Sequence, residues 1–237
     1  MGLSSATLAE LDALTARIDA KNIELGNSIN ANIGKLPDWI QKKIVEAVVR
    51  LWALVDKLRT TVIRVLASPG DPDKLQDAAR EWNDKVGQPS SAQSGGAQLN
   101  AKEVDNWWDG PAKIKYGDLL PPQNFAMRDI TTVFTTTIAK GFKDLATAIK
   151  KLWVAMAVAF GALIAGLIGA VTSAGTLVGL PAAPFIAAGA VVVCIIAIIT
   201  GMDTLRSDCD GIKTDLNGAL TNVNSYYDDH WPKATVY

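Results

Sequence analysis

The feature that most constrains this chain is a long stretch without charge: residues 152–202 contain no Asp, Glu, Lys or Arg. Leu152–Val171 and Phe185–Met202 each match the roughly 20 apolar residues that cross a hydrocarbon core of about 30 Å as a helix. Between them, TSAGTLVGLPAAP supplies glycines and prolines for a turn that also lacks charge. Because the turn has no charged group, its entry into a bilayer does not require the desolvation of an ion. The stretch therefore predicts an apolar helical hairpin able to enter a membrane.

The rest of the chain has the composition of a soluble protein, because it holds all 23 Lys and Arg and all 24 Asp and Glu residues. The formal net charge of −1 and the absence of a basic cluster argue against nucleic acid as a partner. A lipid bilayer is the expected partner instead. Cys194 and Cys209 lie on one predicted helix about 22 Å apart, which is too far for a disulfide.

Apolar residues recur at helical spacing along most of the chain, and no alternating strand pattern is found. The predicted fold class is all-α: an elongated helical bundle with a long antiparallel helical hairpin that ends in an uncharged apolar tip. Four parts are expected: an N-terminal helical pair at 1–70, a second helical region at 71–151, the hydrophobic hairpin at 152–202, and a return helix and tail at 203–237.

Two sequences in the second region predict interruptions. Residues 87–98, GQPSSAQSGGAQ, have the composition of a flexible polar connector. Pro121-Pro122 predicts a break before the long helix that runs into the apolar stretch, because proline lacks a backbone N–H and its ring clashes with the preceding turn.

The hairpin has three kinds of residue with a predicted role. Lys150 and Lys151 precede Trp153, a charged-then-aromatic boundary typical of a membrane interface. The small residues Gly161, Ala165 and Gly169 share one helix face and predict a helix-packing seam, either inside the hairpin or between copies in a homo-oligomer. The side chains expected to contact lipid are Trp153, Phe160, Ile164, Leu167, Ile168, Phe185, Val192, Ile195 and Ile198.

Permanent burial is the alternative for this stretch, as the core hairpin of a soluble bundle. Ordinary core helices keep a polar face, however, and a soluble bundle seldom has two successive helices of this length without charge. The composition leaves open whether membrane contact is constitutive or triggered.

Trp108-Asp109-Gly110 follows an amphipathic helix and precedes Pro111-Ala112-Lys113-Ile114-Lys115-Tyr116. The helix before it carries Asp73, Leu75, Ala78, Ala79 and Trp82. Over about residues 71–149 the chain thereby resembles WXG proteins, the small helical-hairpin substrates of ESX (type VII) secretion. The resemblance implies a hairpin turn at Trp108 and Gly110, export without a cleaved signal peptide, and often a helical protein partner. The family's Tyr-x-x-x-Asp/Glu export signal is absent. The residues four positions after Tyr116, Tyr226 and Tyr227 are Leu120, His230 and Trp231, and none of them is acidic.

No catalytic motif is found: the chain lacks Cys-x-x-Cys, His-Glu-x-x-His, a phosphate-binding glycine loop and Gly-x-Ser-x-Gly. Its single histidine, His230, has no apparent metal or catalytic partner, so we expect no enzyme activity, no cofactor and no metal. The first hypothesis is a secreted or surface protein that inserts residues 152–202 and forms a pore or permeabilises a membrane, as a toxin does. The alternative is a resident membrane hairpin that acts as a structural or docking scaffold.

Overall fold

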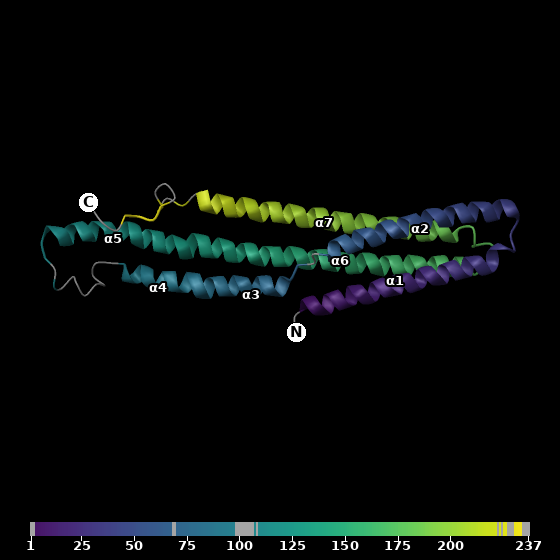
Figure 1. Ribbon diagram of the computed structural model, residues 1–237, viewed down its shortest axis with the longest axis horizontal. Helices are drawn as coiled ribbons and strands as arrows, with labels where there is room; N and C mark the ends of the chain where they lie inside the picture. The colour runs from purple at the N-terminus through teal and green to yellow at the C-terminus, as the bar shows by residue number, and fades with distance from the viewer. Residues whose placement is uncertain are drawn as a thin grey trace. The chain divides into compact units, whose positions relative to one another are not determined.

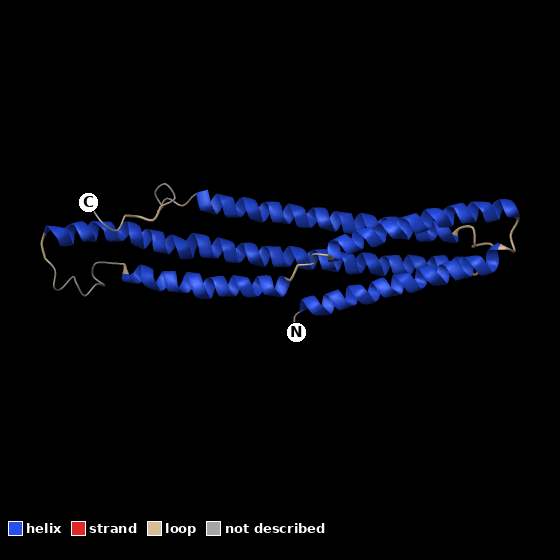
Figure 2. Ribbon diagram, viewed as in Figure 1, coloured by secondary structure: helices blue, strands red, loops and turns tan. Residues whose placement is uncertain are grey.

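The computed structural model of the chain consists of α-helices joined by turns (Figures 1 and 2). It describes residues 3–67, 70–97, 107, 109–221, 223, 225, 226 and 230–233, and this part of the chain contains no β-strand. The predicted all-α class is confirmed. The helices are α1 Leu3–Ile33, α2 Asp38–Leu66, α3 Pro72–Trp82, α4 Gln88–Gly96, α5 Pro111–Asp129, α6 Thr136–Ala174 and α7 Ala183–Thr221, with π-helical segments η1 Asn83–Gly87 and η4 Ile130–Thr135.

The helices group into two compact units, and each unit combines segments that are far apart in sequence. Unit 1 comprises Met1–Asp71 and Ala148–Arg206, and unit 2 comprises Pro72–Thr147 and Ser207–Tyr237. The apolar hairpin therefore belongs to the same compact unit as the N-terminal helical pair. Both α6 and α7 contribute residues to both units.

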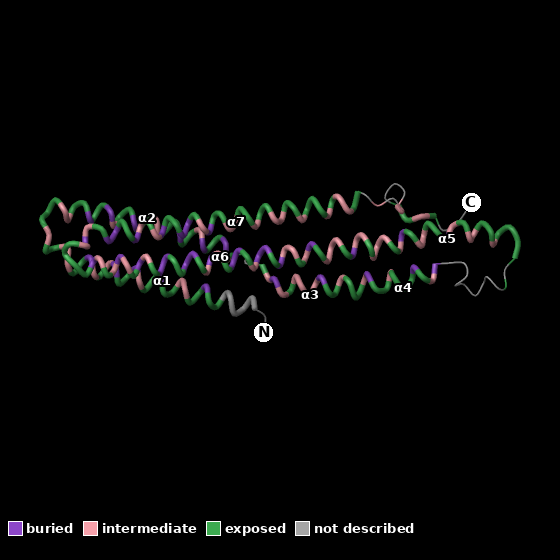
Figure 3. Tube along the Cα trace, turned by 180° about the vertical axis from the view of Figure 1, so that it is seen from behind, coloured by how far each residue is buried: buried purple, intermediate pink, exposed green. Residues whose placement is uncertain are grey.

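Unit 1 has a core to which all four of its helical segments contribute apolar side chains. Helix α2 buries residues at alternating three- and four-residue steps, as expected for one face of an amphipathic helix. Figure 3 shows buried positions recurring along α1, α2 and the adjoining parts of α6 and α7. The largest fully buried side chains of this core are Leu11, Leu25, Ile44, Leu51, Trp153, Met156, Phe160, Leu163, Leu167, Leu180, Val191 and Ile198.

The two turns of unit 1 lie at the same end of that unit (Figure 1). The side-chain amide of Asn32, near the end of α1, donates a hydrogen bond of 3.2 Å to the carbonyl oxygen of Ala174, the last residue of α6. In the α6–α7 turn the backbone N–H of Leu180 donates to the carbonyl oxygen of Thr176 at 2.9 Å. These bonds satisfy polar groups that a helix end would otherwise leave without partners.

In unit 2, η1 packs against η4, and α4 packs along α5 and η4. The hydroxyl of Thr131 donates to the carbonyl oxygen of Gly87 at 3.0 Å. The side-chain amide of Asn124 donates to the carbonyl oxygen of Ser94. A Cβ on Gly87 would lie 2.7 Å from Cγ2 of Thr135, so the glycine permits close packing of the two π-helical segments.

The prediction of a flexible connector at residues 87–98 is wrong, because Gln88–Gly96 forms the helix α4. Gly87 and Gln88 both have right-handed helical backbone angles, so α4 continues from η1 without a break and Pro89 lies inside this helical run. The polar composition fails as a guide here because contact with a neighbouring helix, rather than helix propensity, holds this segment.

The predicted break at Pro121-Pro122 is also wrong, because α5 continues from Pro111 to Asp129 through both prolines. Both proline rings are exposed, whereas Leu120 and Ala126 are buried. Burial of Leu120 and Ala126 favours the helix enough to offset the hydrogen bonds that the prolines remove.

After α7, the chain contacts α5 and η4 through the side chain of Tyr226. Its hydroxyl donates to the carbonyl oxygen of Ala126 at 2.9 Å, and its ring meets Phe134 and Trp231 edge-on. Partial burial, together with the nearby carboxylate of Asp129, raises the pKa of the Tyr226 phenol. This cluster anchors the tail that follows α7.

An ion-pair network joins α6 to α7 on the surface of unit 2. The ammonium group of Lys140 lies 2.9 Å from Asp144 and 3.0 Å from Asp215. Hydrogen bonds to these two carboxylates raise the pKa of Lys140. Beneath them, Gly141 packs against Ile212, where an added Cβ would lie 3.3 Å from Cγ2 of that isoleucine.

We predict that Phe160→Ala destabilises the protein by about 3–5 kcal/mol, because the ring is buried and its loss leaves a cavity. Val158→Ala is the control, since Val158 lies two residues away in the same apolar helix and is exposed; it should change stability by less than about 0.5 kcal/mol. Urea unfolding followed by circular dichroism measures both. Equal losses of unfolding free energy in the two variants would contradict a core that includes only one face of the hairpin.

Candidate membrane-inserting hairpin

The apolar hairpin has one buried face and one exposed face. Two helical runs, Pro111–Ala174 and Ala183–Thr221, are long and apolar enough to cross a membrane by length and composition. Within their most apolar windows, 39% and 28% of the residues are buried inside the protein. Since the core helix of a soluble protein is mostly buried, these fractions leave a large part of the hairpin surface without a protein neighbour.

The structure divides the side chains predicted to contact lipid into two groups. Trp153, Phe160, Ile164, Leu167, Ile195 and Ile198 are buried in unit 1. Ile168, Phe185 and Val192 are exposed. In this fold only the second group is accessible to a bilayer, and the first group becomes accessible only if unit 1 opens.

The exposed face contains apolar residues that the sequence reasoning missed. On α6, Val154 and Val158 are exposed, and on α7 Val193, Ile196 and Ile199 are exposed. Val154, Val158, Gly161, Ala165 and Ile168 follow alternating steps of four and three residues along one face. Every face of this stretch is apolar, however, so the spacing alone does not distinguish the exposed face from the buried one. Selecting the largest side chains instead favoured the residues that fill the core.

The seam predicted inside the hairpin is wrong, because Gly161 and Gly169 have no atom within 4 Å of an added Cβ and Ala165 is exposed. Close approach of α6 to α7 occurs at a neighbouring row. A Cβ on Gly166 would lie 2.4 Å from the Cβ of Ala190. Helix α6 is rotated so that the row with Gly161 faces away from α7, and a role for that row between copies stays a prediction.

Trp153 does not occupy the position expected of an interfacial tryptophan. Its ring is buried, and its indole N–H finds no hydrogen-bond partner. Asn22 of α1 is also buried in unit 1, with its side-chain oxygen unpartnered. A buried polar group without a partner costs about 1–3 kcal/mol, so both groups weaken the closed form of unit 1.

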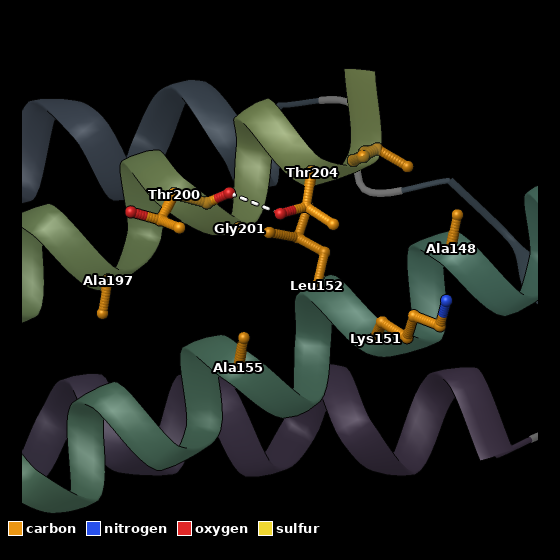
Figure 4. Close-up of a pocket in the computed structure, with 9 residues that line it drawn as sticks. Ala148, Lys151, Leu152, Ala155, Ala197, Thr200, Gly201 and Thr204 are labelled. Carbon is orange, nitrogen blue, oxygen red and sulfur yellow. Dashed lines mark hydrogen bonds between the residues drawn. The ribbon is translucent and has the colours of Figure 1, made fainter. Parts of the chain in front are cut away.

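Small residues leave a groove between α6 and α7 near the charged end of the hairpin (Figure 4). Its volume is about 410 Å³. The hydroxyl of Thr204 donates to the carbonyl oxygen of Thr200 at 2.9 Å beside it. The lining provides one ammonium group and two hydroxyls in apolar surroundings, and no carboxylate, imidazole or thiol. The lining residues are Ala148, Lys151, Leu152, Ala155, Ala197, Thr200, Gly201, Thr204 and Leu205.

The predicted hairpin turn is described in part. Trp108 lies outside the described residues. Gly110 has φ +101°, which residues with a side chain rarely adopt, and α5 begins at the next residue. The conformation of Gly110 is the one expected of a turn glycine that precedes a helix.

No group of three or more His, Cys, Asp or Glu residues that could hold a metal ion occurs among the described residues. Comparison with known proteins adds no homologue: no family model, curated protein or solved structure matches the chain. The candidate site is therefore defined by the geometry of the hairpin alone.

We predict opposite effects on stability for two substitutions in α6. Gly166→Ala should destabilise by about 1–3 kcal/mol, because the new methyl overlaps Ala190. Gly161→Ala should stabilise by about 0.5–1 kcal/mol, because the site is open and alanine favours the helix. Urea unfolding of the two variants measures both signs.

A compensating change tests the cause. Adding Ala190→Gly to Gly166→Ala should restore most of the lost stability, since it removes the methyl that the new side chain meets. Effects of the same sign in the two single variants, or no recovery in the double variant, would contradict this placement of α6 against α7.

Proposed function

We propose that this protein inserts the α6–α7 hairpin, residues 152–202, into a lipid bilayer and permeabilises it. The observation that carries the proposal is an uncharged helical hairpin of bilayer length whose outward face is apolar. Water exposure of that face is unfavourable, and lipid is a solvent that removes the cost without requiring a polar partner.

Full insertion requires unit 1 to open. Residues such as Phe160 and Leu167, buried in the closed form, come to face lipid or another protein once the hairpin spans the bilayer. Exchanging a protein core for hydrocarbon has a modest net cost, because both environments are apolar. Opening also lets Asn22 find a hydrogen-bond partner in water, which favours the change.

The row of Gly161, Ala165 and Gly169, in which Gly161 and Ala165 are exposed and Gly169 is half-buried, supports association after insertion, either in a homo-oligomer or with a helical partner. Small residues allow helix backbones to approach closely in a bilayer, where packing rather than the hydrophobic effect drives association. In this proposal several hairpins form the pore, and the protein acts as a toxin-like membrane module without enzyme activity, cofactor or metal.

A second candidate function is a resident membrane hairpin that holds a helical scaffold on one side of the bilayer. Lys140, Lys143, Lys150 and Lys151 precede the hairpin, and such positive flanks favour the cytoplasmic side. Both ends of the hairpin would then remain on that side.

The WXG resemblance extends the first candidate to type VII export without a cleaved signal peptide. The turn-type φ of Gly110 and the packing of η1 and α4 along η4 and α5 are compatible with the helical hairpin that the resemblance implies, and the export itself rests on the resemblance alone. Cell fractionation tests this part: protein in the culture fluid favours export, whereas protein found only in detergent-extracted membranes favours the resident scaffold.

We predict that Val193→Arg abolishes insertion while leaving the soluble fold intact. Val193 is exposed and lies near the middle of the second apolar segment, and a charge at the centre of a spanning helix costs roughly 2.5–3.5 kcal/mol. Leu220→Arg is the matched control, since it adds the same charge to an exposed site of α7 outside the apolar stretch. Release of dye from liposomes is the measurement.

Wild type and Leu220→Arg should release dye, and Val193→Arg should not. Liposome binding by the wild type without release would reject the pore and favour the resident hairpin. A wild-type protein that neither floats with liposomes nor releases dye would contradict both candidate functions.

A further inference from the structure

The end of unit 1 that carries both turns has an unusual set of exposed apolar side chains. The exposed fraction is 94% for Val178, 64% for Phe185 and 63% for Trp39. Val178 lies in the α6–α7 turn, Phe185 follows at the start of α7, and Trp39 stands at the start of α2. The hydrogen bond from Asn32 to Ala174 holds the two turns at the same end.

Basic side chains accompany these apolar residues. Lys35, Lys42 and Lys43 are exposed in the segment 34–43, where Asp38 is the only acidic residue, and residues 175–185 carry no charge. The ammonium group of Lys43 lies 5.4 Å from the ring centroid of Trp39, within the range of a cation–π interaction. This end of unit 1 is therefore both apolar and positively charged.

An anionic lipid surface has the matching chemistry. Tryptophan locates at the headgroup level of membranes, and lysines near the surface are attracted to anionic lipids. An acidic protein would also attract the lysines. The apolar turn, however, is continuous with the hairpin that enters the bilayer under the proposed function, so lipid accounts for both halves of the surface.

We propose that Trp39, Val178 and Phe185, together with Lys35, Lys42 and Lys43, form a docking surface for anionic lipid headgroups. The inference rests on the proposed function and adds the class of lipid and the order of events. Lysines bind the headgroups first and orient the α6–α7 turn towards the bilayer. The uncharged turn then enters ahead of the two helices, with no ion to desolvate.

Binding to vesicles of phosphatidylcholine, with or without phosphatidylserine, tests the surface in the chain of 237 residues. At low salt the wild type should bind the phosphatidylserine vesicles more tightly, and added salt should reduce the difference. Lys42→Glu with Lys43→Glu should lower the affinity for these vesicles about tenfold or more. Lys57→Glu with Arg64→Glu makes the same charge change farther along α2 and should alter the affinity less than about twofold.

Val178→Asp tests the apolar half of the surface. The side chain is nearly fully exposed, so the soluble fold should tolerate the change, which circular dichroism checks. Binding should fall for both kinds of vesicle, because a carboxylate now enters the interface with the turn.

Several outcomes would overturn the docking surface. One is unchanged affinity in the Lys42 and Lys43 variant, and another is an equal loss in its Lys57 and Arg64 control. A change of oligomeric state by Val178→Asp in lipid-free buffer, measured by analytical ultracentrifugation, would assign the surface to a second copy instead. If the wild type releases dye and these docking variants release it equally well, the docking surface is wrong and the proposed function stands. If the wild type binds no vesicle, the proposed function itself fails.

Discussion

The structure of unit 1 depends on the packing of an uncharged hairpin against the amphipathic pair α1 and α2. Helices without a polar face cannot be left in water on all sides, so the hairpin needs a partner along its length. Phe160 and Leu167 contribute one face to a core shared with Leu25 and Leu51. The two N-terminal helices cover only one side of the hairpin, and its opposite side is apolar and exposed.

This unequal coverage gives the hairpin two compatible environments. Its inner face is suited to a protein core and its outer face to lipid, and neither carries a charge that would prevent exchange between them. Close approach at Gly166 allows α6 and α7 to stay paired in either environment. The buried, unpartnered side-chain oxygen of Asn22 marks a place where the closed form is weaker than an ideal core.

Local composition misled the sequence analysis where a neighbouring helix determines the outcome. Gln88–Gly96 is polar and rich in small residues, yet it is helical because it packs along α5 and η4. Pro121 and Pro122 lie inside a helix for a similar reason, since the side chains of Leu120 and Ala126 in the same helix are buried against the protein. Propensity is a weak determinant compared with tertiary packing.

By itself, the sequence determined the helical class, the extent of the apolar hairpin and the place of its turn, because these depend on periodicity and on the absence of charge over a continuous stretch. Only the tertiary structure decided which face of that hairpin is covered. An all-apolar helix has no polar side to define its orientation, so periodicity could not separate buried Trp153 from exposed Val154. For the same reason the sequence could not distinguish the row at Gly166, which contacts α7, from the row at Gly161, which does not. Both rows contain glycine, and only the position of α7 decides which of them lies at the helix contact.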